Sequence, residues 1–179
     1  MKIKPPAIEN IIEEAIKMLV HCVEENCRND KPLILHSLRV GFVAMGLNFP
    51  RDVVVAGILH DLVEDTNCDF ETIKRYFGHE VESLVKTLTQ EHIEDYKKRW
   101  QVLLEKIKKK GKHAMIIKII DANDNLTYIP LIKSKKSIKE TLWKHHFLSE
   151  ELRPFLSRNQ TFRDYQNHLQ STEAKLENF

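Results

Sequence analysis

The stretch Ile58–Thr66, ILHDLVEDT, places four ionisable side chains at the end of an apolar run. If a helix continues through this stretch, residues four apart share one face, so His60 lies above Glu64. Asp61 lies above Asp65 for the same reason. Carboxylates that are removed from water repel one another and are costly unless a cation lies beside them. A divalent metal ion would meet that need. Histidine nitrogen with carboxylate oxygen suits Mn, Fe or Zn, whereas an all-oxygen set would suit Mg or Ca.

Two other apolar segments each carry one side chain that can bind a metal ion. His36 lies in LILHSLRVG, and Asp121 interrupts MIIKIIDANDNL. Taken singly, a histidine in an apolar segment is more often a hydrogen-bonded core residue, and the aspartate could form a salt bridge with Lys118 or Lys86. Because three apolar segments all deliver metal-capable groups, a shared metal site explains them better than independent accidents do.

The composition indicates a globular protein without an obvious polyanionic partner. The chain has 179 residues, of which 42% are hydrophobic, and a formal net charge of +2, so we expect one domain over residues 1–179 and no binding of DNA or RNA. Three cysteines without a CxxC pair indicate a reducing compartment. No apolar stretch is long enough to cross a bilayer or to form a signal peptide. We therefore expect a cytoplasmic protein.

Scarce glycine and proline and the absence of alternating patterns predict an all-α fold. Amphipathic spacing predicts helices over about residues 8–26, 33–45, 69–78, 79–88, 91–110, 114–129, 137–155 and 162–176, and one from 51 that carries ILHDLVEDT. His145 and His146, in WKHHFL, diverge on a helix and have no apparent carboxylate partner, so we expect surface histidines.

The order His36, His60, Asp61 and Asp121 resembles that of the HD-domain metal-dependent phosphohydrolases. ILHDLVEDT followed by FETIKRYFGHEVESLVKTLT is most similar to the hydrolase domain of the RelA/SpoT homologues. Those enzymes remove pyrophosphate from the 3′ position of guanosine tetra- and pentaphosphate, usually with Mn²⁺. The resemblance extends over about residues 7–130 and implies an HD-domain helical bundle. Residues 131–179 resemble nothing that we recognise.

The resemblance implies roles for nine residues. The metal ligands would be His36, His60, Asp61 and Asp121, with Mn²⁺ as the expected ion. Glu64 and Asp65 match the pair of acidic residues that orient and deprotonate the attacking water, which a divalent ion makes more acidic. Asn125, Arg28 and Lys98 match positions that contact the nucleotide. For Arg28 and Lys98, a solvated surface cation is at least as good an interpretation.

The chain departs from this family in its expected substrate pocket. NDKPLILHSL lacks the glycine, the tyrosine and the second proline of the family's G-x-P-Y-I-x-H-P, and DANDN replaces DRLHN. Every expected metal ligand is kept, so hydrolysis of another nucleotide, such as a deoxynucleotide or NADPH, stays open. A non-catalytic sensor of metal and nucleotide and a buried ion network in an interaction domain are further alternatives. The sequence allows a homodimer.

Overall fold

The computed structural model describes residues 7–177, and within this range the chain is helical without a strand. The expected all-α fold is therefore confirmed. No helix in this range is both long and apolar enough to span a bilayer. The chain divides into two compact units, Met1–Lys110 and Gly111–Phe179, which are described separately. The expectation of one domain over residues 1–179 stays a prediction, and residues 1–6 and 178–179 lie outside the described range.

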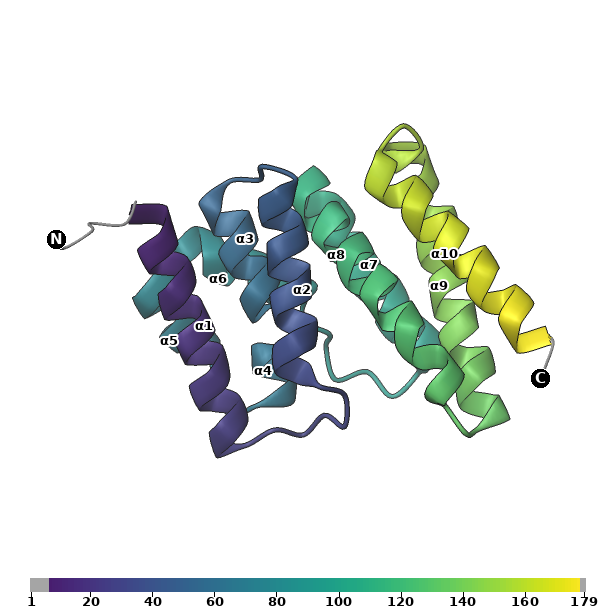
Figure 1. Ribbon diagram of the computed structural model, residues 1–179, viewed down its shortest axis with the longest axis horizontal. Helices are drawn as coiled ribbons and strands as arrows, with labels where there is room; N and C mark the ends of the chain where they lie inside the picture. Colours follow the sequence, from purple (N-terminus) through teal and green to yellow (C-terminus); the bar gives the residue numbers. More distant parts are fainter. Residues whose placement is uncertain (1–6, 178–179) are drawn as a thin grey trace, which may run out of the picture. The chain divides into compact units, whose positions relative to one another are not determined.

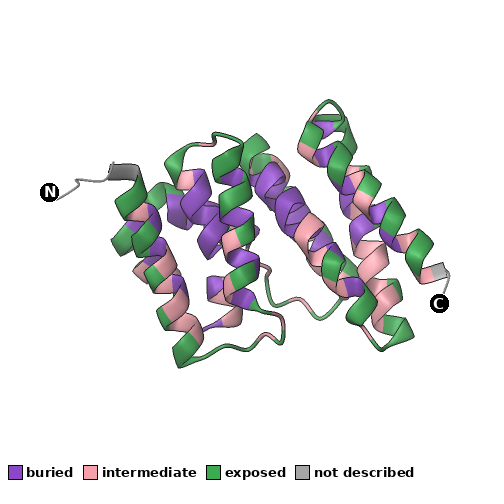
Figure 2. Ribbon diagram, in the orientation of Figure 1, coloured by how far each residue is buried: buried purple, intermediate pink, exposed green. Residues whose placement is uncertain are grey.

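The first unit is built around one short, almost completely buried helix. It contains α1 (Ala7–Glu25), α2 (Leu33–Gly46), α3 (Arg51–Leu59), α4 (Leu62–Asp65), α5 (Phe70–Phe77), α6 (His79–Leu88) and α7 (Tyr96–Lys110). The residues Val53–Leu59 of α3 are all buried, and α3 packs against α1, α2 and α6 (Figures 1 and 2). Apolar residues all round a helix require neighbours on every side, which is why α3 lies at the centre of this unit.

The helix that carries ILHDLVEDT is not continuous. α3 ends at Leu59 and α4 begins at Leu62, so His60 and Asp61 form a turn between them. Asp61 has φ −96° and ψ −3°, and its carbonyl accepts a hydrogen bond from the N–H of Asp65. The prediction of one uninterrupted helix is therefore wrong, although this hydrogen bond keeps Asp65 one helical turn beyond Asp61.

The second unit contains α8 (Lys112–Asn125), the 3₁₀ helix η1 (Leu126–Leu131), α9 (Lys135–Leu156) and α10 (Gln160–Glu177). α10 packs against α8, η1 and α9. The Ser134 side chain caps α9 by accepting a hydrogen bond from the N–H of Ser137. Both helices that follow η1 thus begin within two residues of the predicted positions.

Candidate metal centre

The candidate site begins with two buried histidines on neighbouring helices. His36 lies in the first turn of α2 and His60 follows α3; their exposed fractions are 0% and 2%. Their Nε2 atoms are 3.2 Å apart, and the rings are tilted by 59° with centroids 5.1 Å apart. Two buried imidazole nitrogens this close can share a proton or bind a common cation.

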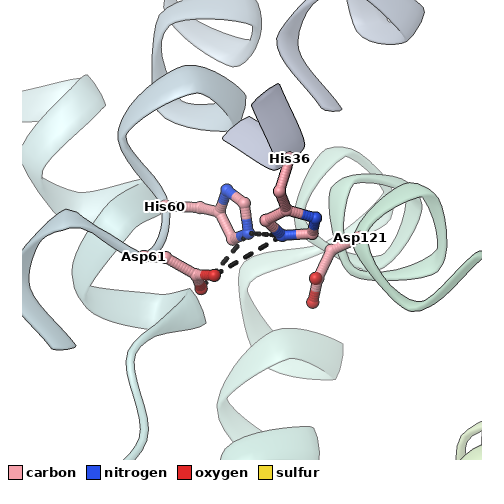
Figure 3. Close-up of side chains that lie close together, drawn as sticks. All are labelled: His36, His60, Asp61 and Asp121. Atoms are coloured by element: carbon pink, nitrogen blue, oxygen red, sulfur yellow. Dashed lines mark hydrogen bonds and ion pairs between the residues drawn. The ribbon is translucent and has the colours of Figure 1, made fainter. Parts of the chain in front are cut away.

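Asp61 brings a carboxylate to the same point. Its Oδ1 is 3.2 Å from His60 Nε2, and its Oδ2 is 3.5 Å from His36 Nε2. One ligand atom from each of these residues lies within 4.8 Å of the others, and Figure 3 shows the three side chains turned toward one another. Figure 3 also draws Asp121, which belongs to the second unit and is described below. Two nitrogens and an oxygen at these separations suit a first-row divalent ion.

A hydrogen bond at Nδ1, the second ring nitrogen of His60, fixes the orientation of this side chain. Nδ1 lies 2.8 Å from the carbonyl oxygen of Gly57, an acceptor, so Nδ1 must carry a proton and donate it. In the neutral ring the lone pair is then on Nε2, the atom that faces His36 and Asp61. Metal-binding histidines are typically held by a hydrogen bond of this kind. The chemistry of these side chains therefore fits a divalent metal ion.

Glu64 and Asp65 lie on α4 and each is fixed by a distant segment. Glu64 Oε1 accepts a hydrogen bond from the N–H of Gln90 at 2.6 Å. Asp65 Oδ2 accepts one from Asn29 Nδ2 at 2.8 Å. Burial raises the pKa of Asp65 above its usual value, while the bond from Asn29 opposes that rise. Asp65 is thus a carboxylate with an increased proton affinity, one turn beyond Asp61.

Asp121 is a buried carboxylate of α8 with two partners on its own helix. Its Oδ2 accepts from Lys118 Nζ at 2.8 Å, and its Oδ1 accepts from Asn125 Nδ2 at 2.5 Å. The salt bridge considered as the alternative from the sequence is therefore present with Lys118, which is 6% exposed. Lys86, the other candidate, lies instead over the ring of Phe70. Asn125 thus orients Asp121, whereas the sequence predicted that Asn125 contacts the nucleotide.

The two cations expected to contact the nucleotide are both exposed. Arg28 donates from Nη2 to Asn67 Oδ1 at 2.6 Å, and its backbone N–H donates to the carbonyl of Asp65 at 2.8 Å. Arg28 therefore lies beside the segment that follows the candidate site. Lys98 lies in the first turn of α7, and within residues 7–177 its ammonium group has no hydrogen-bond or ion-pair partner. The structure does not bring Lys98 together with the histidines.

Asn29 and Lys31, for which the sequence predicted no role, contact two carboxylates of this site. Lys31 donates from Nζ to Asp61 Oδ2 at 2.7 Å, and Asn29 donates to Asp65 as described above. The available signal was the position of NDK directly before the helix that carries His36. The side chain of Lys31 is only 17% exposed.

His145 differs from its expected position on the surface. It is fully buried, and its Nδ1 lies 3.0 Å from the hydroxyl of Tyr165 on α10. His146 is exposed and pairs with Glu173. The expectation of surface histidines is therefore right for His146 and wrong for His145. α9 has one face against α10, and sequence spacing alone did not show which of two adjacent histidines lies on that face.

An all-helical fold with imidazole and carboxylate groups converging on one point defines a helical protein with a candidate divalent-metal centre. A family model described as HD domain matches residues 15–142. The chain therefore belongs to the HD domain family, as its motifs predicted. The matched range includes residues of both compact units. It ends at residue 142, which is 12 residues beyond residue 130, where the resemblance seen in the sequence ends.

Among its relatives, the chain is 29% identical over 130 residues to a guanosine-3′,5′-bis(diphosphate) 3′-pyrophosphohydrolase of Aquifex aeolicus, which covers 66% of this chain and 18% of the relative. It is 36% identical over 74 residues to the MESH1 enzyme of the same name from Drosophila melanogaster, covering 41% of each chain. The chain thus spans less than half the length of these curated relatives. The expected similarity to this branch is confirmed.

A solved structure shares the fold. It is described as a metazoan ortholog of SpoT that hydrolyses ppGpp, and it matches with a TM-score of 0.74 at 20% identity, covering 97% of this chain and 98% of that one. At this identity the match establishes the fold alone. The expected HD-domain helical fold is confirmed.

Proposed function

We propose that this protein is a metal-dependent phosphohydrolase that uses water to remove pyrophosphate from the 3′ position of guanosine 3′,5′-bis(diphosphate) or a closely related nucleotide. The observation that carries the proposal is the convergence of His36 Nε2, His60 Nε2 and the Asp61 carboxylate within 4.8 Å, on a chain of the HD domain family. The activity named for its relatives in Aquifex and Drosophila supports this choice of reaction.

His36, His60 and Asp61 would hold the metal ion, with Asp121 as the fourth ligand. Support for Asp121 comes from the order of the four residues along the chain and from its burial beside Asn125, which fixes one of its oxygens. Mixed nitrogen and oxygen donors suit Mn, Fe or Zn, and we favour Mn²⁺ because the RelA/SpoT homologues, which the chain resembles, usually use that ion. When bound, the ion would supply a positive charge that acidifies water and stabilises charge developing on phosphate.

Two acidic residues of the chain would orient the attacking water and accept its proton. Asp65 is one turn from Asp61, and its raised pKa makes it a better acceptor for a proton than an exposed carboxylate. Asn29 keeps one Asp65 oxygen occupied, which leaves the other for water. Glu64, held by the backbone of Gln90, would orient the same water. A non-catalytic sensor would have no need for two carboxylates fixed next to a metal centre.

Three side chains remain candidates for nucleotide binding: Arg28, Lys98 and Asn125. The contact of Arg28 with Asn67 supports its placement next to the catalytic carboxylates. A second candidate substrate class, a deoxynucleotide or NADPH, is favoured by Leu33. This residue stands where the family has tyrosine, and it is 2% exposed in the core, so it offers neither a ring nor a hydroxyl to a base.

We infer that the protein acts in the cytoplasm as a single functional domain. Free Cys22, Cys27 and Cys68 support a reducing compartment. A net charge of +2 supports a small nucleotide as ligand in preference to DNA or RNA. The proposal allows a homodimer, which sedimentation velocity at two protein concentrations would detect.

The test is hydrolysis of a nucleotide panel by the purified chain with added Mn²⁺. The panel contains guanosine tetra- and pentaphosphate, a deoxynucleoside monophosphate and NADPH, and the released pyrophosphate and orthophosphate are quantified. We expect pyrophosphate from the guanosine polyphosphates and loss of Mn²⁺ binding in His36→Ala and Asp121→Ala, but not in the control His79→Ala, whose side chain is 77% exposed. Cleavage of another nucleotide alone would shift the substrate assignment. Failure to bind Mn²⁺ would exclude the mechanism.

A further inference from the structure

The loop between α1 and α2 is fixed to the segment that carries the candidate catalytic residues. The Arg28 N–H donates to the carbonyl of Asp65 at 2.8 Å, and the side chains of Arg28 and Asn29 bond to Asn67 and Asp65. The Asn29 side chain also accepts from the N–H of Lys31 at 3.0 Å. These bonds hold the loop next to α4, and from there the Lys31 side chain reaches Asp61.

Lys31 is the cation that reaches the candidate metal centre from this loop. Its Nζ is 2.7 Å from Asp61 Oδ2, and the Lys31 and Asp61 side chains are 17% and 15% exposed. The other Asp61 oxygen, Oδ1, is the one that lies nearest His60. The carboxylate can therefore present Oδ1 to a metal ion while Oδ2 stays next to the ammonium group.

The acidic residues around Lys31 make a cation necessary if this site is to bind phosphate. Asp61, Glu64 and Asp65 place three carboxylates within five positions, and they would repel an incoming phosphate. Of the two cations expected from the sequence to bind phosphate or base, Arg28 is exposed and bonded to Asn67, and Lys98 is exposed. Lys31 is instead largely removed from solvent, where a charge-assisted hydrogen bond is strongest.

We propose that Lys31 is a phosphate-binding residue of this site, whose ammonium group is held ready by Asp61 and donates to a phosphate oxygen of the bound nucleotide. The inference rests on the proposed function, since it takes the metal centre and a phosphorylated substrate as given. The ligand class is a pyrophosphate group, free or as part of a nucleotide. Because the ammonium group lies 2.7 Å from an oxygen of Asp61, an expected metal ligand, a phosphate bound to that metal ion would come within its reach.

The experiment uses the full chain and measures two affinities by calorimetry. The first is that of Mn²⁺ for the metal-free protein, and the second is that of inorganic pyrophosphate for the Mn²⁺-loaded protein. Lys31→Met keeps much of the side-chain length without its charge, and Lys74→Met is the matched control, because Lys74 is an exposed lysine of α5 paired only loosely with Glu71 at 3.8 Å. Circular dichroism and thermal melts establish that each variant is folded.

We expect Lys31→Met to lower pyrophosphate affinity by about ten- to a hundredfold, the value of one charge-assisted hydrogen bond. Mn²⁺ affinity should be kept or increased, because a cation next to the metal has been removed. Lys74→Met should change neither. Unchanged pyrophosphate affinity in Lys31→Met, or a parallel loss of Mn²⁺ affinity, would overturn this inference while leaving the proposed function intact. A wild-type chain that binds neither Mn²⁺ nor pyrophosphate would overturn both.

Discussion

Gly41 of α2 lies against Ile58 of α3 so closely that a Cβ atom on residue 41 would be 2.3 Å from Ile58 Cγ1. Ile58 is fully buried and cannot turn into solvent to make room. The approach is mutual, since a Cβ on Gly57 would be 3.4 Å from the Cα of Gly41. His36 lies on α2 and His60 directly follows α3, so the close packing of α2 on α3 also brings the two imidazoles near each other.

Replacing Gly41 with alanine should therefore damage both stability and metal binding. We expect Gly41→Ala to lower the free energy of unfolding by about 1–3 kcal/mol, the usual cost of overpacking a core, and to weaken Mn²⁺ binding by separating the histidines. Urea denaturation and metal titration measure the two effects. Gly46→Ala is the control on the same helix, because nothing lies within 4 Å of its added Cβ. Equal behaviour of the two variants would contradict this account of the helix pair.

The sequence predicted the helices that periodicity alone defines, and it failed where a helix begins or ends without a change in the apolar pattern. α2 was expected to end at about residue 45 and ends at Gly46, because its apolar positions and the following turn are local signals. The turn at His60 and Asp61 has no such signal, since the residues on both sides favour a helix. α7 starts at Tyr96, five residues later than expected, after Asp95 accepts a hydrogen bond from the N–H of Lys98.

The same distinction applies to the candidate site. Residue type and spacing identified His36, His60 and Asp61, because an apolar helix with a histidine or carboxylate is conspicuous in sequence. Lys31 was missed, because a lysine in a polar loop is ordinary and only its contact with Asp61 makes it notable. Long-range side-chain contacts of this kind follow from the packed fold and cannot be deduced from local pattern.

Asp65→Asn should separate catalysis from binding. The new amide oxygen can still accept the hydrogen bond from Asn29, so the local structure is kept, but the side chain can no longer take a proton. We expect turnover to fall by about 10²- to 10⁴-fold with unchanged Mn²⁺ affinity. Steady-state kinetics and calorimetry on one preparation measure both. Asp69→Asn is the control, since Asp69 only caps α5 and asparagine caps equally well. Full activity in Asp65→Asn would rule out the assigned role.

The three cysteines should differ in reactivity. Burial raises the pKa of Cys68 to about 12 and raises that of Cys22. Because the thiolate is the reactive form, we expect iodoacetamide at pH 8 to modify exposed Cys27 at least about tenfold faster than Cys68. Mass spectrometry of the digested protein gives the rates, and denatured protein supplies the reference in which all three react alike. Rapid labelling of Cys68 in the folded protein would contradict the raised pKa of its thiol.

The buried pair of His145 and Tyr165 should make the second unit sensitive to mild acid. The Tyr165 hydroxyl donates to the carbonyl of His145 at 2.9 Å, so His145 Nδ1 is the donor in the 3.0 Å contact between the two side chains. Its Nε2 has no hydrogen-bond partner within the described residues. Burial lowers the pKa of His145 well below its usual value, because a charged imidazolium would be left without water.

The sign of the resulting pH dependence follows from where the proton binds. Above pH 6.5 neither the folded nor the unfolded chain protonates His145, so its contribution to stability is fully present. As the pH falls below 6.5, the unfolded chain binds a proton there and the folded chain does not, so the free energy of unfolding decreases by up to about 1.4 kcal/mol per pH unit. Urea denaturation at pH 7.5, 6.5 and 5.5 measures the slope. His145→Gln should reduce it, while His146→Gln, at the exposed neighbouring position, should leave it nearly unchanged; equal slopes in wild type and His145→Gln would show that His145 is not the group responsible.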